Sequence, residues 1–239
     1  MAERHAVVLA GGLGTRLRPF TTSLPKPLVP IGDIPVLEIV LRQLAGHGFD
    51  RATLAIGYLG ELIRDAVGDG SRLGIAVDYA LETTPLGTIG PVVRILDQLP
   101  ETFLVLNGDV LTDLDYADVL DGHAVSAAPL TIATFERVVE TDFGVLELEG
   151  PTVIGFQEKP TLRYSVSMGV YGLSRATLSR YVPGTTVGFD ELVLDLLARG
   201  EHPRSHPHTG YWLDIGRPAD YERANQEFAD MRGTLLPGG

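Results

Sequence analysis

Short apolar runs alternate with longer amphipathic stretches along the first half of the chain. Residues 5–9 (HAVVL) are nearly all apolar, which is typical of a strand buried on both faces of a sheet. Residues 35–48 instead carry apolar side chains at helical spacing and end in glycines. The two patterns then recur, predicting strands at residues 52–56, 75–80 and 102–106 and helices at residues 59–67 and 87–99. This alternation is typical of an α/β fold with a mostly parallel sheet.

The second half of the chain has a less regular pattern. It predicts strands at residues 130–135 and 167–173, a hairpin of residues 144–148 and 152–156, and helices at residues 190–198 and 219–231. Neither an internal repeat nor a long linker is visible in the sequence. We therefore expect one domain, residues 1–239, with a regular α/β half at 1–115 and a more mixed half at 116–239.

A glycine-rich loop follows the first strand, at residues 9–19 (LAGGLGTRLRP). Glycines let the backbone turn sharply and approach a ligand, and successive backbone N–H groups can form an anion-binding concavity. Arg16 and Lys26 add positive charge, so the segment suits a triphosphate. The sequence of this loop does not match the dinucleotide-binding motif G-x-G-x-x-G, because Leu17 stands where the last glycine would be. It does not match a P-loop either, because Gly14 is followed by Thr15-Arg16. A plain strand-to-helix turn is the alternative interpretation.

Composition narrows the class of protein. The net charge of −12 argues against binding to nucleic acid or to an anionic membrane surface. The absence of cysteine excludes disulfides and thiol chemistry, and no apolar run approaches the roughly 18 residues of a membrane span. Because no signal-peptide pattern is visible, we expect a cytoplasmic protein. Lys26 and Lys159 are the only lysines, and each precedes a proline.

Two aspartates are candidate metal ligands. Asp109 follows the apolar strand at 102–106 and the turn Asn107-Gly108, and carboxylates at strand ends are good ligands for Mg²⁺. Asp214 is the polar residue of an otherwise apolar segment, residues 212–216 (WLDIG). Aspartate is also common in ordinary turns, which is the alternative for each position.

Two other groups of residues have competing interpretations. Asp113-Leu114-Asp115 spells the D-x-D motif of metal-dependent glycosyltransferases, but Asp115 also suits the N-cap of a helix. His202, His206 and His208 are interleaved with prolines, which favours a loop or an edge strand over a metal site.

Residues 9–30 (LAGGLGTRLRPFTTSLPKPLVP) resemble the signature of the sugar-1-phosphate nucleotidylyltransferases. The resemblance continues through Gly108-Asp109, Glu158-Lys159-Pro160 and residues 212–216, and so covers nearly the whole chain. It implies a Rossmann-like, mostly parallel mixed sheet flanked by helices, with a smaller mixed sugar-binding part. Residues 1–115 would be the nucleotide-binding half and residues 116–239 the sugar-phosphate-binding half. It also implies a Mg²⁺-assisted reaction in which a sugar 1-phosphate attacks the α-phosphate of an NTP in line, giving an NDP-sugar and pyrophosphate.

The resemblance implies roles for the matched positions. Arg16 would contact the leaving phosphates, Lys26 would lie near the α-phosphate, and Asp109 and Asp214 would hold Mg²⁺. The implied nucleotide-binding residues are Leu9, Gly11, Gly12, Gly14, Thr15, Glu82, Pro85, Gly87, Thr88 and Gly108. The implied sugar-phosphate-binding residues are Gly144, Glu158, Lys159 and Ser167.

The spelling of particular segments bears on the substrates. Residues 82–88 (ETTPLGT) are closest to the mannose- and heptose-1-phosphate guanylyltransferases, which favours GTP. Ser167 stands where many relatives carry asparagine, which leaves an atypical sugar open. An NTP and a sugar 1-phosphate are the expected partners, and the family often forms dimers or tetramers. A glycosyltransferase acting through Asp113 and Asp115, and a non-catalytic regulatory homologue, are the competing functions.

Overall fold

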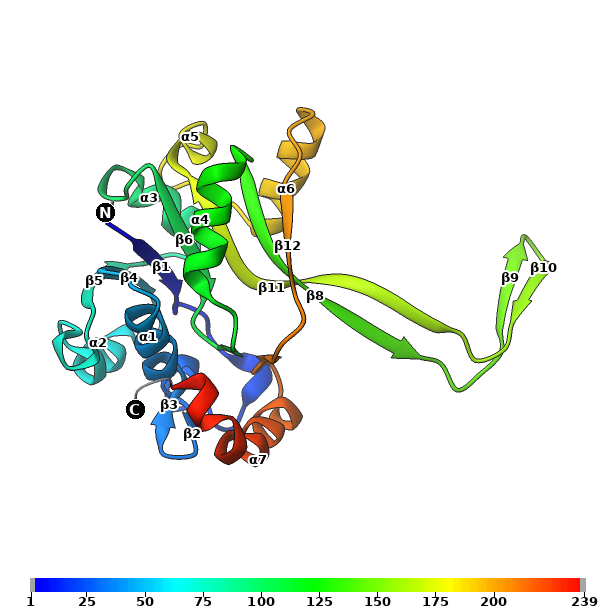
Figure 1. Ribbon diagram of the computed structural model, residues 1–239, viewed down its shortest axis with the longest axis horizontal. Helices are drawn as coiled ribbons and strands as arrows, with labels where there is room; N and C mark the ends of the chain where they lie inside the picture. Colours follow the sequence, from blue (N-terminus) through cyan, green and yellow to red (C-terminus); the bar gives the residue numbers. More distant parts are fainter. Residues whose placement is uncertain (1–2, 237–239) are drawn as a thin grey trace.

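The computed structural model describes residues 3–236, which are built around a seven-stranded sheet (Figure 1). Its strands, in spatial order, are β12 (Arg204–His208), β8 (Leu130–Glu140), β11 (Thr161–Ser174), β6 (Thr102–Asn107), β1 (His5–Leu9), β4 (Arg51–Ile56) and β5 (Ala76–Leu81). Pairing is parallel from β6 through β5 and between β12 and β8, whereas β11 is antiparallel to both of its neighbours. The predicted α/β fold with a mostly parallel mixed sheet is confirmed.

Helices cover both faces of this sheet (Figure 1). On one face lie α1 (Val36–Gly46), α2 (Gly60–Val67) and α4 (Tyr116–Ser126), and on the other lie α3 (Gly90–Arg94), α5 (Arg175–Leu178) and α6 (Phe189–Ala198). Each face has its own hydrophobic core. In β1, Ala6 and Val8 pack into the core beneath α1, α2 and α4, and Val7 packs into the core beneath α3, α5 and α6. Burial on both faces explains why this strand has an almost uninterrupted apolar sequence.

A third core lies beside the carboxyl ends of the strands. It joins α7 (Pro218–Leu235) to two short pairs, β2 (Pro30–Ile31) with β3 (Ile34–Pro35) and β7 (Val110–Thr112) with β13 (Trp212–Asp214). Leu17, from the 3₁₀ turn η1 (Thr15–Leu17), is fully buried there. Leu17 thus anchors the glycine-rich loop in this core.

A long two-stranded projection, which we call the arm (residues 136–165), leaves the body of the molecule (Figure 1). β8 and β11 continue past the sheet, and β9 (Val145–Glu149) and β10 (Thr152–Gln157) form a bent hairpin at the end. The predicted hairpin is confirmed, but the strands predicted at residues 130–135 and 167–173 were too short. Side chains on both faces of the arm are exposed, so its sequence lacks the one-sided pattern that identifies a half-buried strand.

The prediction of one continuous helix at residues 87–99 was wrong. Only α3 and the 3₁₀ turn η4 (Leu96–Gln98) form, and the preceding residues make a loop. The backbone N–H groups of Ile89 and Gly90 both donate to the Val187 carbonyl, at 2.9 and 3.2 Å, which holds the chain out of a helical path. The other predicted helices and strands of the body form within a few residues of their expected ends. Among residues 3–236, none of the helices is both long and apolar enough to cross a bilayer.

Candidate active site

A cavity of about 550 Å³ opens at the carboxyl ends of β1, β4 and β6. Ligands of open α/β sheets bind at this edge of the strands. The cavity is lined by Leu9, Ala10, Gly11, Gly12, Leu13, Lys26, Pro27, Ala55, Gly57, Tyr58, Glu82, Thr83, Thr84, Pro85, Gly87, Thr88, Pro91, Asn107 and Asp109. It therefore combines the glycine-rich loop, the loop before α3 and the end of β6.

The glycine-rich loop turns back on itself at Gly14. Gly14 has a φ of +59°, and a Cβ there would lie 3.0 Å from Cγ2 of Thr21. The Thr21 hydroxyl donates a 2.7 Å hydrogen bond to the Gly14 carbonyl. A left-handed backbone and a close neighbour both require glycine at this position. The turn brings the loop against Lys26, whose Cβ would be 3.2 Å from the same added atom.

Lys26 and Asp109 form the central ion pair of the cavity. Lys26 begins the 3₁₀ turn η2 (Lys26–Leu28), between two prolines, and Asp109 follows β6. Both side chains are largely buried, with 13% and 22% of their surfaces exposed. The Gly108 N–H donates to the Leu9 carbonyl at 3.0 Å, which ties the Asp109 turn to the glycine-rich loop.

Asp214 completes this cluster from the other half of the chain. The pairing of β13 with β7 places Asp214 opposite Val110, and its Oδ1 lies 4.0 Å from the Lys26 Nζ. Partial burial and the neighbouring Asp109 charge raise the pKa of the Asp214 carboxyl, and Lys26 and Arg16 partly offset this. Two carboxylates and Lys26 therefore meet beside the cavity, within electrostatic range of Arg16.

The two carboxylates fit a divalent cation. Asp109 Oδ1 is buried and accepts no hydrogen bond from the described residues, so it is free to ligate. Carboxylate oxygens are ligands that Mg²⁺ prefers. No cluster of three histidine, cysteine or acidic residues suited to a metal occurs within residues 3–236. A site with two protein carboxylates is the arrangement in which substrate phosphates supply further ligands to Mg²⁺.

The loop before α3 is shaped by Glu82 and Gly87. Glu82 Oε1 accepts a 2.6 Å hydrogen bond from the Leu86 N–H, which closes the loop on itself. Gly87 has a φ of +78°, and a Cβ there would lie 2.5 Å from the Val187 carbonyl oxygen. Of the predicted nucleotide-binding residues, seven line the cavity: Leu9, Gly11, Gly12, Glu82, Pro85, Gly87 and Thr88. Gly14, Thr15 and Gly108 instead belong to the turns that support it.

Arg16 and Ser167 lie at the edge of the cluster. Arg16 is exposed on η1, and its charge helps to lower the pKa of Asp214. The Ser167 hydroxyl donates to the Tyr171 hydroxyl at 3.1 Å, and the Asp214 charge helps to raise the pKa of Tyr171. Arg16 is thus within electrostatic range of Asp214, and Ser167 contacts Tyr171, which is also within that range.

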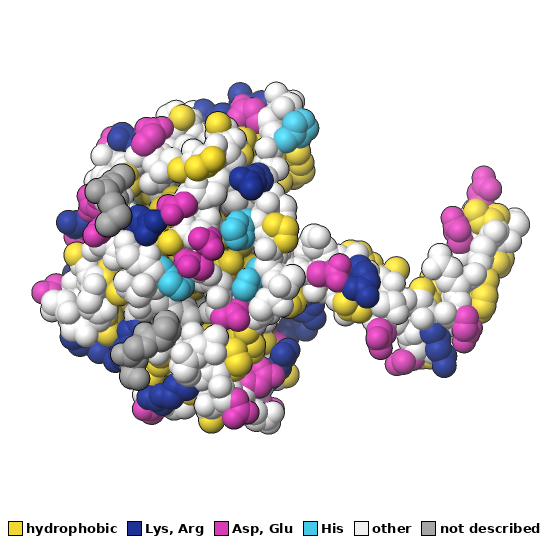
Figure 2. Space-filling view, viewed as in Figure 1, with side chains coloured by type: hydrophobic (Ala, Val, Ile, Leu, Met, Phe, Trp, Pro, Cys, Tyr) yellow, Lys and Arg dark blue, Asp and Glu magenta, His cyan; other side chains and the backbone are white. Residues whose placement is uncertain are grey.

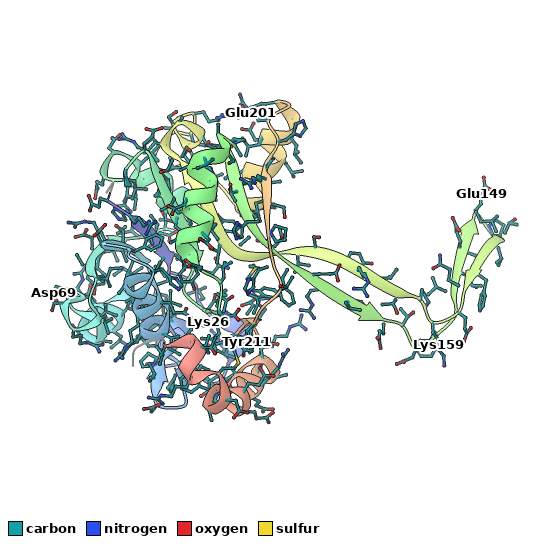
Figure 3. The ribbon with its side chains drawn as sticks, viewed as in Figure 1. Lys26, Asp69, Glu149, Lys159, Glu201 and Tyr211 are labelled. Carbon is teal, nitrogen blue, oxygen red and sulfur yellow. The ribbon has the colours of Figure 1, made fainter. Side chains whose placement is uncertain are left out.

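Gly144, Glu158 and Lys159 are not brought together with this cluster. They lie on the arm, and Figure 3 shows Lys159 far from Lys26, at the bend before the terminal hairpin. A Cβ on Gly144 would lie 2.5 Å from the Phe156 ring and 3.4 Å from Glu158 Oε2, so the three residues adjoin one another. Within one chain, these three predicted sugar-phosphate residues therefore lie apart from the predicted metal ligands, whereas the fourth, Ser167, lies near them.

Gly57, Tyr58 and Asn107 are cavity residues for which the sequence predicted no role in binding. Gly57 and Tyr58 follow β4, and Asn107 ends β6 next to Asp109. The signal that could have identified them is their position, because each follows or ends a predicted parallel strand on the edge that carries the glycine-rich loop.

Asp113, Asp115 and the histidines that offered competing interpretations have structural roles outside the cavity. Asp115 is the N-cap of α4, and its carboxylate accepts a 2.8 Å hydrogen bond from the Ala117 N–H. Asp113 accepts from the Tyr211 N–H at 2.6 Å and lies 2.7 Å from His208 Nε2. His206 and His208 lie on the edge strand β12. The capping and edge-strand interpretations are confirmed.

Comparisons with known proteins agree on one family. The family described as "Nucleotidyl transferase" matches residues 5–231. The chain is 35% identical, over 97% of its length, to a mannose-1-phosphate guanylyltransferase of Mycobacterium tuberculosis, and 34% identical, over 90%, to a probable mannose-1-phosphate guanylyltransferase 1 of Oryza sativa subsp. japonica. It spans 66% and 62% of the length of these two relatives.

A solved structure extends the comparison to three dimensions. HddC from Yersinia pseudotuberculosis, in a complex described as containing GMP-PN, matches 94% of this chain and 99% of its own with a TM-score of 0.73. The two sequences are 29% identical.

Proposed function

This chain belongs to the nucleotidyl transferase family, and from that membership we propose that it transfers a nucleotidyl group from an NTP to a sugar 1-phosphate, releasing pyrophosphate. The observation that carries this proposal is the pairing of Lys26 with Asp109, beside Asp214, at the edge of a cavity bounded by the glycine-rich loop. A reaction between two polyanions needs cations and a metal site at one place, and this cluster offers both.

The proposed chemistry depends on position and charge. Asp109 and Asp214 would hold Mg²⁺, which when bound neutralises charge on the phosphates and helps to orient them. Lys26 would neutralise charge that develops at the α-phosphate, and exposed Arg16 would contact the leaving pyrophosphate. The sugar phosphate is already an anion at neutral pH, so the site needs no general base. In-line attack then follows from holding the two phosphates in place.

We further propose GTP as the nucleotide. The support comes from two sources: the guanylyltransferase names of the two relatives and the GMP-PN complex of HddC. The segment Glu82 to Thr88 would surround the base and ribose, with Glu82 already turned inward by its bond to Leu86. Gly144, Glu158, Lys159 and Ser167 would bind the sugar phosphate.

The test is pyrophosphate release with Mg²⁺ across a grid of substrates. GTP, dTTP, UTP, CTP and ATP would each be combined with the 1-phosphates of mannose, glucose, N-acetylglucosamine and heptose. We expect release only when both substrates are present, and fastest in a GTP row. A blank grid would contradict the proposal, and calorimetry with NDP-sugars would then test for a regulatory protein that binds without turnover.

A further inference from the structure

The arm exposes an unusual amount of apolar surface. Figure 2 shows hydrophobic side chains along its visible face, interspersed with charged ones. Eleven of the twenty exposed large hydrophobic side chains found in residues 3–236 lie on the arm: Val138, Val139, Phe143, Val145, Leu146, Leu148, Val153, Ile154, Phe156, Leu162 and Tyr164. Their exposed surface is on the order of 1,000 Å², and a typical interface buries about 800 Å² per partner. A concentration of exposed apolar side chains of this size on one projection favours a protein–protein contact.

The terminal hairpin gains little from its own chain. β9 and β10 form a separate two-stranded sheet and pair only with each other. An isolated two-stranded hairpin is marginally stable in water. The bend before it is nevertheless well defined, because the Thr141 hydroxyl and N–H both donate to the Pro160 carbonyl, at 3.0 and 3.3 Å. The bend that carries Glu158 and Lys159 therefore has a fixed geometry, and the exposed apolar side chains of the arm are left available to a partner.

The cavity, for its part, is short of positive charge. Lys26 is the one lysine or arginine among its lining residues, and it already faces Asp109 and Asp214. A nucleoside triphosphate and a sugar phosphate together bring far more negative charge than Lys26, Arg16 and one divalent cation can balance. The other lysine of the chain, Lys159, stands at the bend of the arm, and the structure gives it no acidic partner within residues 3–236.

We propose that two copies of this chain form a dimer in which the arm of each copy lies over the other, so that Lys159 and Glu158 complete the sugar-phosphate site of the partner. This inference rests on the proposed function. A two-fold dimer brings the same surface of both copies together, so exchanging the arms would cover both apolar surfaces and complete both sites at once.

Closure of the arm onto its own cavity is disfavoured by its pairing. The ladder between β8 and β11 is continuous from Thr161 opposite Glu140 to Ser167 opposite Thr134. It carries the bend about 17 Å beyond the sheet along the strand direction, since each residue advances the strand by about 3.3 Å. Folding back would break this ladder. The arm can reach a second copy with this ladder intact. The exposed Leu13 at the cavity rim offers an apolar side chain that the partner's arm can contact.

Complementation between two defective copies tests the inference. Lys26→Met and Lys159→Met would be co-expressed with different tags, and the heterodimer isolated through both tags. If the arms are exchanged, one site of the heterodimer keeps both lysines, and activity should be about half that of the wild-type dimer. Each homodimer should be nearly inactive. An inactive heterodimer would show that the arm serves its own chain, and failure to isolate one would show a monomer; either result overturns the inference.

Two control variants accompany these tests, one on the arm and one on α4. Arg163→Met removes an exposed arm cation that pairs with Glu136, and it should leave activity unchanged. Leu146→Lys combined with Leu148→Lys should convert the dimer to a monomer in sedimentation experiments, whereas Val125→Lys on α4, also an exposed apolar position, should not. Full activity of Lys159→Met alone would also overturn the inference.

A readout without turnover separates this inference from the proposed function. Because the chain has no cysteine, Leu13→Cys and Lys159→Cys can be combined and joined with a flexible bismaleimide. Exchange of the arms predicts a covalent dimer on a denaturing gel, and closure within one chain predicts a cross-linked monomer. If the substrate grid is blank but the covalent dimer forms, the proposed reaction fails while the exchanged arm stands.

Discussion

Lys26 is the residue on which the proposed chemistry depends most. It is held between two prolines and paired with Asp109, so its ammonium group is already in place before substrates bind. We expect Lys26→Met, which keeps the apolar stem, to lower turnover by about 100-fold or more, as the loss of a preorganised charge typically does. Pyrophosphate release from the folded variant measures this. Near-normal turnover, with Arg163→Met as the comparison, would remove Lys26 from the site.

Asp214 makes a second prediction, about stability. Its raised pKa means that the folded state holds the proton more tightly than the unfolded state, so ionisation at neutral pH opposes folding. Asp214→Asn should therefore raise the Tm of the metal-free protein at pH 7, by about 1–2 °C. The gain should shrink as pH falls through the Asp214 pKa towards 3.8, where the unfolded carboxyl also becomes protonated.

Adding Mg²⁺ should give the wild-type protein a higher Tm than Asp214→Asn, the reverse of the order expected without metal. The wild-type Tm should rise with the metal because two carboxylates are available, whereas Asp214→Asn should respond weakly. Asp230→Asn, an exposed position on α7, is the control and should behave as the wild type. Equal responses of all three proteins to Mg²⁺ would argue that Asp214 is not a ligand.

At the scale of single elements, Asp115 at the start of α4 distinguishes the proposed nucleotidyl transferase from a glycosyltransferase. Asp115 caps this helix, and its replacement by alanine should destabilise the protein by about 1 kcal/mol, or about 2–4 °C in Tm. Turnover should persist, because Asp115 does not line the cavity. Asp118→Ala changes an acid in the first turn that is not the cap, so its effect should be smaller. Loss of activity in folded Asp115→Ala would reopen the glycosyltransferase interpretation.

The elements also show how far the sequence alone could predict the structure. Strands such as β1 and β6 are buried on both faces, so their apolar runs identified them, and the residues after them located the cavity. The arm has no such signal because both of its faces are exposed. The resemblance implied a role for Lys159, but its place in space depends on a ladder and a bend that no local pattern encodes.

At the scale of the whole molecule, the buried His123 links a helix to two strands of the sheet. His123 of α4 lies 3.0 Å from the hydroxyls of both Thr131 and Ser174, and burial lowers its pKa below 6.5. Stability from such a group is fully present above pH 6.5 and is lost as pH falls below that value, because the unfolded state then binds the proton more readily. We therefore expect the Tm to fall between pH 7 and pH 5.

The variants His123→Gln and His202→Gln test this explanation by thermal denaturation across that pH range. His123→Gln should have a lower Tm at pH 7 but a shallower pH dependence, whereas exposed His202→Gln should follow the wild type. An unchanged slope in His123→Gln would assign the acid sensitivity to other groups, such as His5, whose pKa is also lowered by burial.

The central claim is that the α-phosphate of an NTP moves onto a sugar phosphate at the Lys26–Asp109–Asp214 cluster. The most direct measurement follows GTP carrying radioactive phosphorus at the α-position, incubated with Mg²⁺ and a sugar 1-phosphate that releases pyrophosphate. We predict that the label appears in a nucleotide sugar and that unlabelled pyrophosphate is formed in equal amount, with both products formed at least about 100-fold more slowly by Lys26→Met. Label found only in free GMP or GDP would identify a hydrolase and contradict the proposed transfer.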